Sequence, residues 1–351
     1  MDISNPTLAW IENRCYRVCD NTYVTDNDEI APYTEEVYDP YELNNLEFED
    51  ESIEITPYKG SLYKHSFQVN SNLYGMIIGA KGATLKRIKL STNTKINVPK
   101  LGQEGSIVII GENKKNIITA RYQINCIIEN ARSKMQPTHF LGIPTNSENI
   151  VDQFTKFKDN ILNNYANDEG IVENIFQIPN KLHVTIVTLI LLDEIERKKA
   201  IDVFEACHKD VIKPFLDKSG PITIVFKGLK CMNQNSSKAR VLYCSIHNEE
   251  GYLQELLDKI AEYFIDQGVA TTKFNKVKMH MTLMNVRYIH LRSQESNDKT
   301  ILSFDATNIL KNHEDTYLGQ INLSTIHLSQ IHTKTEGGYY KATAEINLIN
   351  S

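Results

Sequence analysis

Two short stretches of the sequence hold a histidine and a threonine in the same frame. The first is Lys181-Leu-His-Val-Thr185 and the second is Lys278-Met-His-Met-Thr282. Apolar residues surround both, a composition expected of buried strands. Residues i and i+2 of a strand face the same way, so each histidine should share a face with its threonine. If the two strands are neighbours in a sheet, four polar side chains meet at one place.

Such a group of side chains is suited to acid–base chemistry at a phosphodiester. An imidazole of ordinary pKa accepts or donates a proton near neutral pH. One histidine can take the proton of the attacking oxygen while the other protonates the leaving oxygen, and each role is typically worth about 10²–10⁴ in rate. Threonine hydroxyls can donate to the non-bridging oxygens, where charge builds up. We therefore predict that His183, Thr185, His280 and Thr282 are catalytic.

Other interpretations of these residues stay open. A histidine in a buried strand is more often a satisfied core residue than a catalyst. However, burying four polar groups without partners would cost on the order of several kcal/mol in total, which favours a ligand-binding hollow. No carboxylate cluster of magnesium-site type lies near the strands in the sequence, so we predict no metal and no other cofactor. A further His-x-Ser pattern, His327-Leu-Ser329, occurs later, but the first pair has the spacing that suits two lobes.

A second candidate site is the stretch Gly79-Ala-Lys-Gly82, between two predicted helices. Small residues let a nucleic-acid backbone approach main-chain N–H groups closely. The following helix begins at this loop and directs its positive end toward phosphates. Basic residues in and after the loop add charge. The alternative is a helix cap with no ligand. The predicted nucleic-acid-binding residues are Ile78, Gly79, Ala80, Lys81, Gly82, Lys86 and Arg87.

Charge is distributed unevenly along the 351 residues, whose net charge is −6. Residues 1–60 contain 3 basic and 15 acidic side chains, whereas residues 61–135 contain 12 basic and 3 acidic ones. The basic block suits a polyanionic ligand. The acidic block cannot bury enough apolar area to offset its ordering entropy, so we predict a largely flexible arm over residues 1–60. Trp10–Val18 is the exception, as a short strand or an anchor for a partner.

The basic block shows the pattern of a small α+β domain. The apolar periods predict the order β-α-α-β-β-α, with strands over 63–69, 95–98 and 106–110 and helices over 72–78, 83–90 and 114–132. With the glycine loop between the first two helices, residues 61–133 resemble a type I KH domain. This resemblance implies that the loop clamps about four nucleotides of single-stranded RNA, with single-stranded DNA as the alternative ligand.

A further α+β domain is expected over residues 136–351. The order strand, helix, His-x-Thr strand, helix occurs twice, which favours two related lobes. Predicted strands cover 138–143, 182–191, 222–227, 240–246, 277–286, 318–331 and 339–349; predicted helices cover 148–165, 193–212 and 251–267, and residues 287–300 read as a surface loop. This region resembles the bilobal 2H phosphoesterases, which implies action on RNA ends, 2′,3′-cyclic phosphates or 2′-5′ linkages.

A KH module followed at once by a 2H domain resembles one subunit family of a nuclear cointegrator complex that contains a large helicase. The stretches that carry the resemblance are Tyr63-Lys-His65, Gln136-Pro-Thr-His-Phe-Leu141, Lys181–Thr185, Phe304–Leu310 and Ile326–Gln330. The resemblance implies nuclear localisation, that complex as a partner, and roles in transcriptional coactivation and DNA alkylation damage. Two alternatives stay open: a non-catalytic adaptor whose 2H domain only binds phosphate ends, and a structural subunit recruited through the acidic arm.

Several classes of protein are disfavoured by the sequence. It contains no run of about 18 apolar residues, so we expect no membrane span, and its N-terminus lacks the pattern of a secretory signal. We therefore expect a reducing compartment and free thiols at Cys15, Cys19, Cys126, Cys207, Cys231 and Cys244. The connection Ser133–Thr138 reaches roughly 20 Å when extended, so we expect the KH and 2H domains to hold a nearly fixed relation.

Overall fold

The structure is a computed structural model that describes residues 53–100, 103, 105–249, 251–270, 276–292, 301–333 and 335–348, and two strands near the N-terminus. The chain divides into two units, 1–51 and 52–351. In the first unit, β1 (Leu8–Ile11) pairs antiparallel with β2 (Arg14–Arg17), so the predicted strand around Trp10 is a hairpin. The predicted flexibility of the acidic arm falls on residues outside the described part.

The region expected to be a KH domain is built on a four-stranded antiparallel sheet in the order β3-β4-β6-β5. Its first strand, which precedes the predicted start at residue 61, was not expected from the sequence. It is only three residues long and contains Pro57, and proline is confined to edge strands because it cannot donate to the ladder. The strands are β3 (Thr56–Tyr58), β4 (Leu62–Phe67), β5 (Lys95–Asn97) and β6 (Ile107–Gly111).

Three α-helices cover one face of this sheet and complete the predicted β-α-α-β-β-α order. The longest helix, Lys114–Ser133, forms because apolar residues recur at helical spacing along one side: Ile117, Ala120 and Ile124 are fully buried. Asn113 caps its first turn by accepting a hydrogen bond from the Lys115 N–H at 2.9 Å. The helices are α1 (Tyr74–Ile78, after a 3₁₀ turn at Ser71–Leu73), α2 (Ala83–Thr92, after a 3₁₀ turn at Ala80–Gly82) and α3 (Lys114–Ser133).

The region expected to be a 2H domain is built on an eight-stranded sheet whose order is β12-β9-β10-β11-β8-β7-β13-β14. The register between its two central strands is a single antiparallel pair, Met281 with Val184. The sheet therefore consists of two four-stranded halves that meet at a narrow seam, which agrees with the predicted two lobes. The strands are β7 (His139–Pro144), β8 (His183–Leu189), β9 (Thr223–Cys231), β10 (Val241–His247), β11 (His280–Asn285), β12 (Tyr317–Asn322), β13 (Thr325–Gln330) and β14 (Ala342–Asn347).

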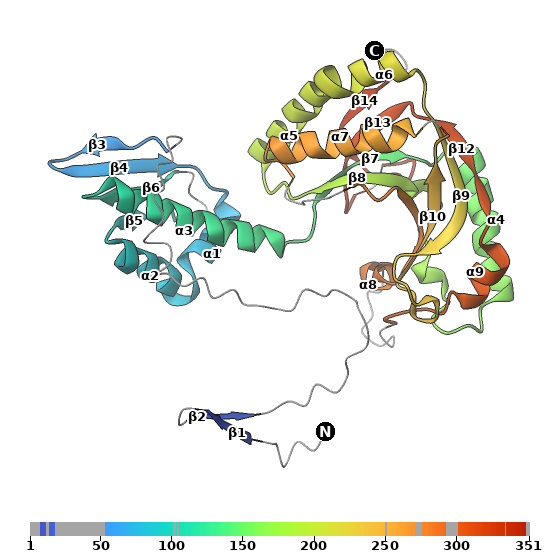
Figure 1. The fold of residues 1–351 in the computed structure, drawn as a ribbon, viewed down its shortest axis with the longest axis horizontal. Coiled ribbons are helices and arrows are strands. Elements are labelled where there is room, and N and C mark those ends of the chain that lie inside the picture. Colours follow the sequence, from blue (N-terminus) through green and yellow to red (C-terminus); the bar gives the residue numbers. More distant parts are fainter. Residues whose placement is uncertain are drawn as a thin grey trace. The chain divides into compact units, whose positions relative to one another are not determined.

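Each half of the sheet has its own helices (Figure 1). The half with β9 and β12 is covered by α4 (Glu148–Asn164) and α9 (Thr307–His313), and the half with β8 and β14 by α5 (Glu194–Cys207) and α7 (Tyr252–Asp266). Large side chains such as Phe154, Phe204 and Phe264 are fully buried between the layers. Among the described helices, none combines the length and the apolar character that crossing a bilayer requires.

The structure differs from the predicted elements in several places. The strand expected over 318–331 is two strands, β12 and β13, in different halves of the sheet. The chain passes from one half to the other at Leu323-Ser324, where neither glycine nor proline marks the break. The loop expected over 287–300 begins with a helix, α8 (Arg287–Arg292), and α9 was not predicted. The helix expected over 193–212 ends at Cys207, where a π-helical turn, His208–Ile212, leads into α6 (Lys213–Ser219).

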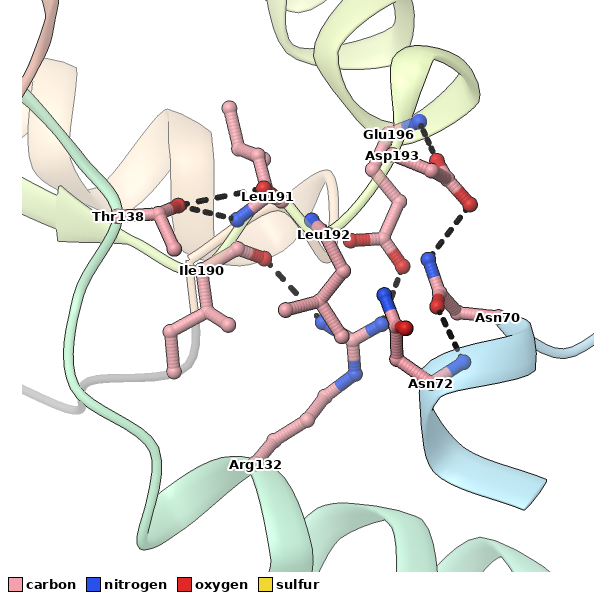
Figure 2. A network of polar contacts seen from close by, with 9 residues as sticks. All are labelled: Asn70, Asn72, Arg132, Thr138, Ile190, Leu191, Leu192, Asp193 and Glu196. Carbon is pink, nitrogen blue, oxygen red and sulfur yellow. Dashed lines mark hydrogen bonds and ion pairs between the residues drawn. The ribbon is translucent and has the colours of Figure 1, made fainter. Parts of the chain in front are cut away.

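Side chains of the KH and 2H domains meet beside the short connection between α3 and β7 (Figure 2). Asn70 Nδ2 donates a hydrogen bond to Asp193 Oδ2 at 2.6 Å. Arg132 forms an ion pair with Glu196, and its Nη1 donates to the Ile190 carbonyl at 3.2 Å. We call these five residues the interdomain clasp. It ties the KH domain to the segment that follows β8.

Candidate active site and nucleic-acid loop

The two His-x-Thr motifs lie on β8 and β11, neighbouring strands at the seam of the 2H sheet. The antiparallel pair of Met281 with Val184 sets the register, which places His183 across from Thr282 and Thr185 across from His280. All four polar side chains are half-buried, whereas the residues that alternate with them are buried. The structure therefore brings the four predicted catalytic residues together on one face of the seam.

Both imidazoles are oriented by the same main-chain contact. His183 Nδ1 lies 2.8 Å from the carbonyl oxygen of Lys181, and His280 Nδ1 lies 2.6 Å from that of Lys278. Because a carbonyl oxygen only accepts, each Nδ1 carries the proton when the ring is neutral. Each Nε2 is then left with a lone pair, which is the state a general base requires.

Burial sets the protonation state of both rings. The pKa of His183 is lowered to about 4, chiefly by burial; the hydrogen bond to the Lys181 carbonyl opposes the shift, and the charges of His280 and Lys181 add to it. Burial also lowers the pKa of His280, with a smaller contribution from the charge of Lys278. Both rings are therefore neutral at pH 7 in the free protein. An anionic phosphate between them would favour the imidazolium and raise both pKa values.

Aromatic rings that the sequence reasoning missed lie against both histidines. The centre of the His183 ring lies 4.5 Å from the centre of the Phe140 ring. It lies 5.4 Å from the centre of the Tyr340 ring, which it meets edge to face. The His280 ring lies edge to face with Tyr243 at 5.6 Å. No local spacing links these rings to the motifs, because Tyr340 lies in the segment before β14 and Tyr243 on β10. Only tertiary structure places them there.

The third pattern, His327-Leu-Ser329, does not join this group. It lies on β13, which is separated from β8 by β7. His327 is in register with Gly142, which in turn is in register with Thr185. Its Nε2 lies 3.7 Å from Glu345, and burial lowers the pKa of His327.

The Gly79–Gly82 loop joins α1 to α2 and has a backbone with several positive φ angles, a conformation that favours glycine. Gly79 and Gly82 have φ of 71° and 80°, and Lys81 between them also has a positive φ of 51°. A Cβ on Gly79 would lie 2.1 Å from Thr84 Oγ1, whereas none would meet an atom within 4 Å at Gly82. The N-terminus of α2 begins at this loop. Ala80, Lys81, Lys86 and Arg87 are exposed, and Ile78 is half-buried.

Cysteines and metal ligands add no further site in the described part of the chain. No group of three or more histidine, cysteine or carboxylate side chains there could hold a metal ion. The described cysteines, Cys126, Cys207, Cys231 and Cys244, are free thiols, and burial raises the pKa of each. The side chains of Cys15 and Cys19 lie outside the described residues. Catalysis without a metal stays a prediction.

Comparison with known proteins defines the class first. The family model for the KH domain matches residues 64–126, and the model for the AKAP7 2′5′ RNA ligase-like domain matches residues 137–348. The chain is therefore a KH protein with a 2H phosphoesterase-like domain. Mouse (Mus musculus) activating signal cointegrator 1 complex subunit 1 is 31% identical over 369 aligned residues, which cover 99% of both chains. The chain belongs to the family of this subunit.

Three solved structures each match a part of the chain. The first KH type I domain of human vigilin is 24% identical, with a TM-score of 0.21, and covers 24% of this chain and 89% of its own. A protein of Thermus thermophilus is 13% identical, with a TM-score of 0.39, and covers 60% of this chain and 97% of its own. A structure described as a phosphoesterase is 12% identical, with a TM-score of 0.36, and covers 61% of this chain and 99% of its own.

Proposed function

We propose that this protein binds single-stranded RNA at the Gly79–Gly82 loop and cleaves a phosphodiester with His183 and His280, without a metal ion. The observation that carries the proposal is the matched geometry at the seam. Two histidines on adjacent strands make the same Nδ1 contact with a main-chain carbonyl, and each faces a threonine of the other motif. A pair of rings kept only for packing would not need the same tautomer twice.

The surroundings of the two rings favour different roles. His183 is packed between Phe140 and Tyr340, and its pKa is lowered to about 4, so its neutral form suits the general base. His280 contacts one ring, Tyr243, and is the better candidate for the acid once a bound phosphate raises its pKa. His183 Nε2 would take the proton of the attacking oxygen, and His280 would protonate the leaving oxygen. Thr185 and Thr282 would donate hydrogen bonds to the non-bridging oxygens.

The KH loop would supply the strand that reaches these residues. Its exposed cations and the N-terminus of α2 attract phosphates, while the positive φ angles of its glycines keep the backbone open to close approach. The interdomain clasp supports a continuous path, because it ties the KH domain to the segment directly after β8. Crosslinking of bound RNA should therefore reach residues near His183 and His280 as well as the loop.

The cellular setting is part of the same proposal. The mouse relative is named as a subunit of the activating signal cointegrator 1 complex. We place this chain in the nucleus, in a helicase-containing complex of that kind, with roles in transcriptional coactivation and in the response to DNA alkylation. Cell fractionation, with identification of the proteins that co-purify, tests this placement. Recovery outside the nucleus without a helicase would reject it.

One observation favours a second function, that of a non-catalytic adaptor. The low pKa of His183 and the lowered pKa of His280 leave both rings neutral in the free protein, so the acid exists only if substrate binding raises a pKa. An adaptor would bind phosphate ends at the same residues without turnover.

Turnover of a small panel of substrates separates the enzyme from the adaptor. The panel contains a 2′,3′-cyclic nucleotide, an RNA with a free 3′ end and a 2′-5′-linked oligonucleotide. The enzyme should lose at least about 10²-fold in rate in His183→Ala and in His280→Ala, with RNA binding at the KH loop unchanged. Equal rates in wild type and variants would show that these histidines are not catalytic. No turnover by the wild type, with phosphate ends still bound, would establish the adaptor.

A further inference from the structure

Each His-x-Thr motif has a lysine two residues before its histidine, and neither lysine has a role in the mechanism above. Lys181 Nζ lies 4.4 Å from the centre of the Tyr340 ring, and Lys278 Nζ lies 5.2 Å from that of Tyr243. These are the two tyrosines that lie edge to face with His183 and His280, at 5.4 and 5.6 Å. The series lysine, tyrosine, histidine therefore occurs on both sides of the seam with nearly the same dimensions.

The two tyrosines come from unrelated positions in the sequence. Tyr243 belongs to β10 and is in register with Thr282 of β11. Tyr340 lies between β13 and β14, in a segment that two side chains hold near Lys181. Lys181 Nζ donates to the Thr333 carbonyl at 3.1 Å, and Asn180 Nδ2 donates to the Gly337 carbonyl at 3.0 Å. Different elements thus build the same arrangement twice. The two motifs alone would not place Tyr243 and Tyr340 beside the histidines, because neither tyrosine belongs to a motif.

The arrangement holds each ammonium group beside an uncharged ring. A lysine over an aromatic face is attracted by the electrons of the ring, and the ring itself does not neutralise the positive charge. Lysine is a common ligand of phosphate groups, as a point charge. Because both lysines sit beside the histidines, one in each lobe, they can act on phosphates next to the one that lies between His183 and His280.

We infer that Lys181 and Lys278 bind the two phosphates that flank the scissile phosphate, one in each lobe, so the preferred substrate is an internal diester of an oligonucleotide. This inference rests on the proposed function, because it takes the histidine pair as the position of the scissile group. A terminal 2′,3′-cyclic phosphate has a neighbouring phosphate on one side only and would engage one lysine. Two equivalent cations predict a strand that crosses the seam.

Four short substrates test the inference. They are a dinucleotide with only its central phosphate, the same dinucleotide with a phosphate on the 5′ side or on the 3′ side, and one with both. Wild-type kcat/KM should rise with each added phosphate. Lys181→Met should abolish the gain from one outer phosphate and Lys278→Met the gain from the other, each by about tenfold. Lys181→Arg and Lys278→Arg should restore most of the gain.

Controls separate this inference from the failure of the proposed function. Lys198→Met, which removes a cation on α5, should leave all four substrates within about twofold of wild type. Each methionine variant is scored by the gain from an outer phosphate relative to its own rate on the dinucleotide without one. Equal losses on all four substrates would place the lysines at the scissile phosphate and overturn the inference, as would no loss on any. Binding of the same ligands in a His183→Ala background needs no turnover. If the wild type cleaves none of the four substrates but binding in the His183→Ala background depends on the lysines, the inference holds and the enzymatic function is rejected.

Discussion

At the scale of single residues, the catalytic proposal depends on how much water reaches two imidazoles. Both rings use Nδ1 for a main-chain carbonyl, so they differ mainly in what packs around them. His183 has two aromatic neighbours and His280 has one. Loss of hydration disfavours the charged form, so the more enclosed ring is the one that starts neutral, as a general base must. A mechanism that used both imidazoles in the same protonation state would need no difference in burial between His183 and His280.

The same burial predicts that acid destabilises the fold through His183. Its pKa is about 4 in the folded protein and 6.5 ordinarily, so the unfolded chain takes up the proton first as the pH falls below 6.5. The free energy of unfolding should therefore decrease between about pH 6.5 and pH 4, by at most about 3 kcal/mol from this residue. His183→Asn should remove this part of the decrease, which urea denaturation at pH 7 and pH 4.5 measures.

An exposed histidine provides the comparison for this measurement. His247 lies at the end of β10 and contacts the Lys227 carbonyl through Nε2. His247→Asn should leave the difference in unfolding free energy between the two pH values close to that of wild type. If His183→Asn and wild type lost the same amount between pH 7 and pH 4.5, the neutral, buried state of His183 would be wrong.

At the scale of elements, the KH loop shows how backbone conformation restricts the sequence. Both glycines have positive φ, but only Gly79 also lacks room for a Cβ, because Thr84 fills the space. A substitution at Gly79 would therefore alter the packing of α2 along with any ligand contact. Gly82 has open space around it, so a short side chain there would project from the loop without a clash. Asparagine and aspartate tolerate positive φ better than other residues.

Gly82 therefore allows a matched test of the phosphate contact. Gly82→Asp adds a negative charge at the start of α2, whereas Gly82→Asn adds a side chain of nearly the same shape without charge. If the loop binds RNA phosphates, Gly82→Asp should weaken the affinity for single-stranded RNA by about tenfold more than Gly82→Asn, and the difference should shrink at high salt. Fluorescence anisotropy with a labelled oligonucleotide measures both affinities. Equal effects of the two variants would exclude a phosphate at this position.

The elements also show what local sequence can and cannot predict. Where one period repeats without interruption, as for Ile117 and Ile124 in α3, the pattern identifies the helix and its buried face. Tertiary contacts decide the rest. No glycine or proline separates β12 from β13, and each strand is defined by the half of the sheet that it joins. The motifs predicted His183 and His280, but nothing near Tyr243 or Tyr340 in the sequence indicates that these rings lie beside them.

At the scale of the whole molecule, the interdomain clasp determines whether two binding sites can act on one strand. Asn70 and Asp193 each cap the start of a helical turn in their own domain, since each accepts a hydrogen bond from the main chain there, at 2.9 and 2.8 Å. They also bond to each other across the junction (Figure 2). Two caps that share a hydrogen bond restrict the ends of both helices at once. A strand held by the loop would then meet β8 in a defined orientation.

Weakening the clasp should therefore affect long substrates more than short ones. Asn70→Ala with Arg132→Ala removes the hydrogen bond to Asp193 and the ion pair with Glu196. A dinucleotide engages only the 2H domain, so its kcat/KM should change less than about twofold. An RNA of about 20 nucleotides, which can reach both sites, should lose about tenfold, because linking two sites raises the effective concentration only while their geometry permits both contacts. Steady-state kinetics on the two substrates gives the ratio.

A control on the same helix isolates the role of the junction. Arg197→Ala breaks the exposed ion pair with Glu194 within α5. It should leave the ratio between long and short substrates at the wild-type value. Equal loss on both substrates in the clasp variant would mean that Arg132 and Asn70 only stabilise the 2H domain. An unchanged ratio would mean that RNA held by the loop does not depend on the clasp to reach His183 and His280.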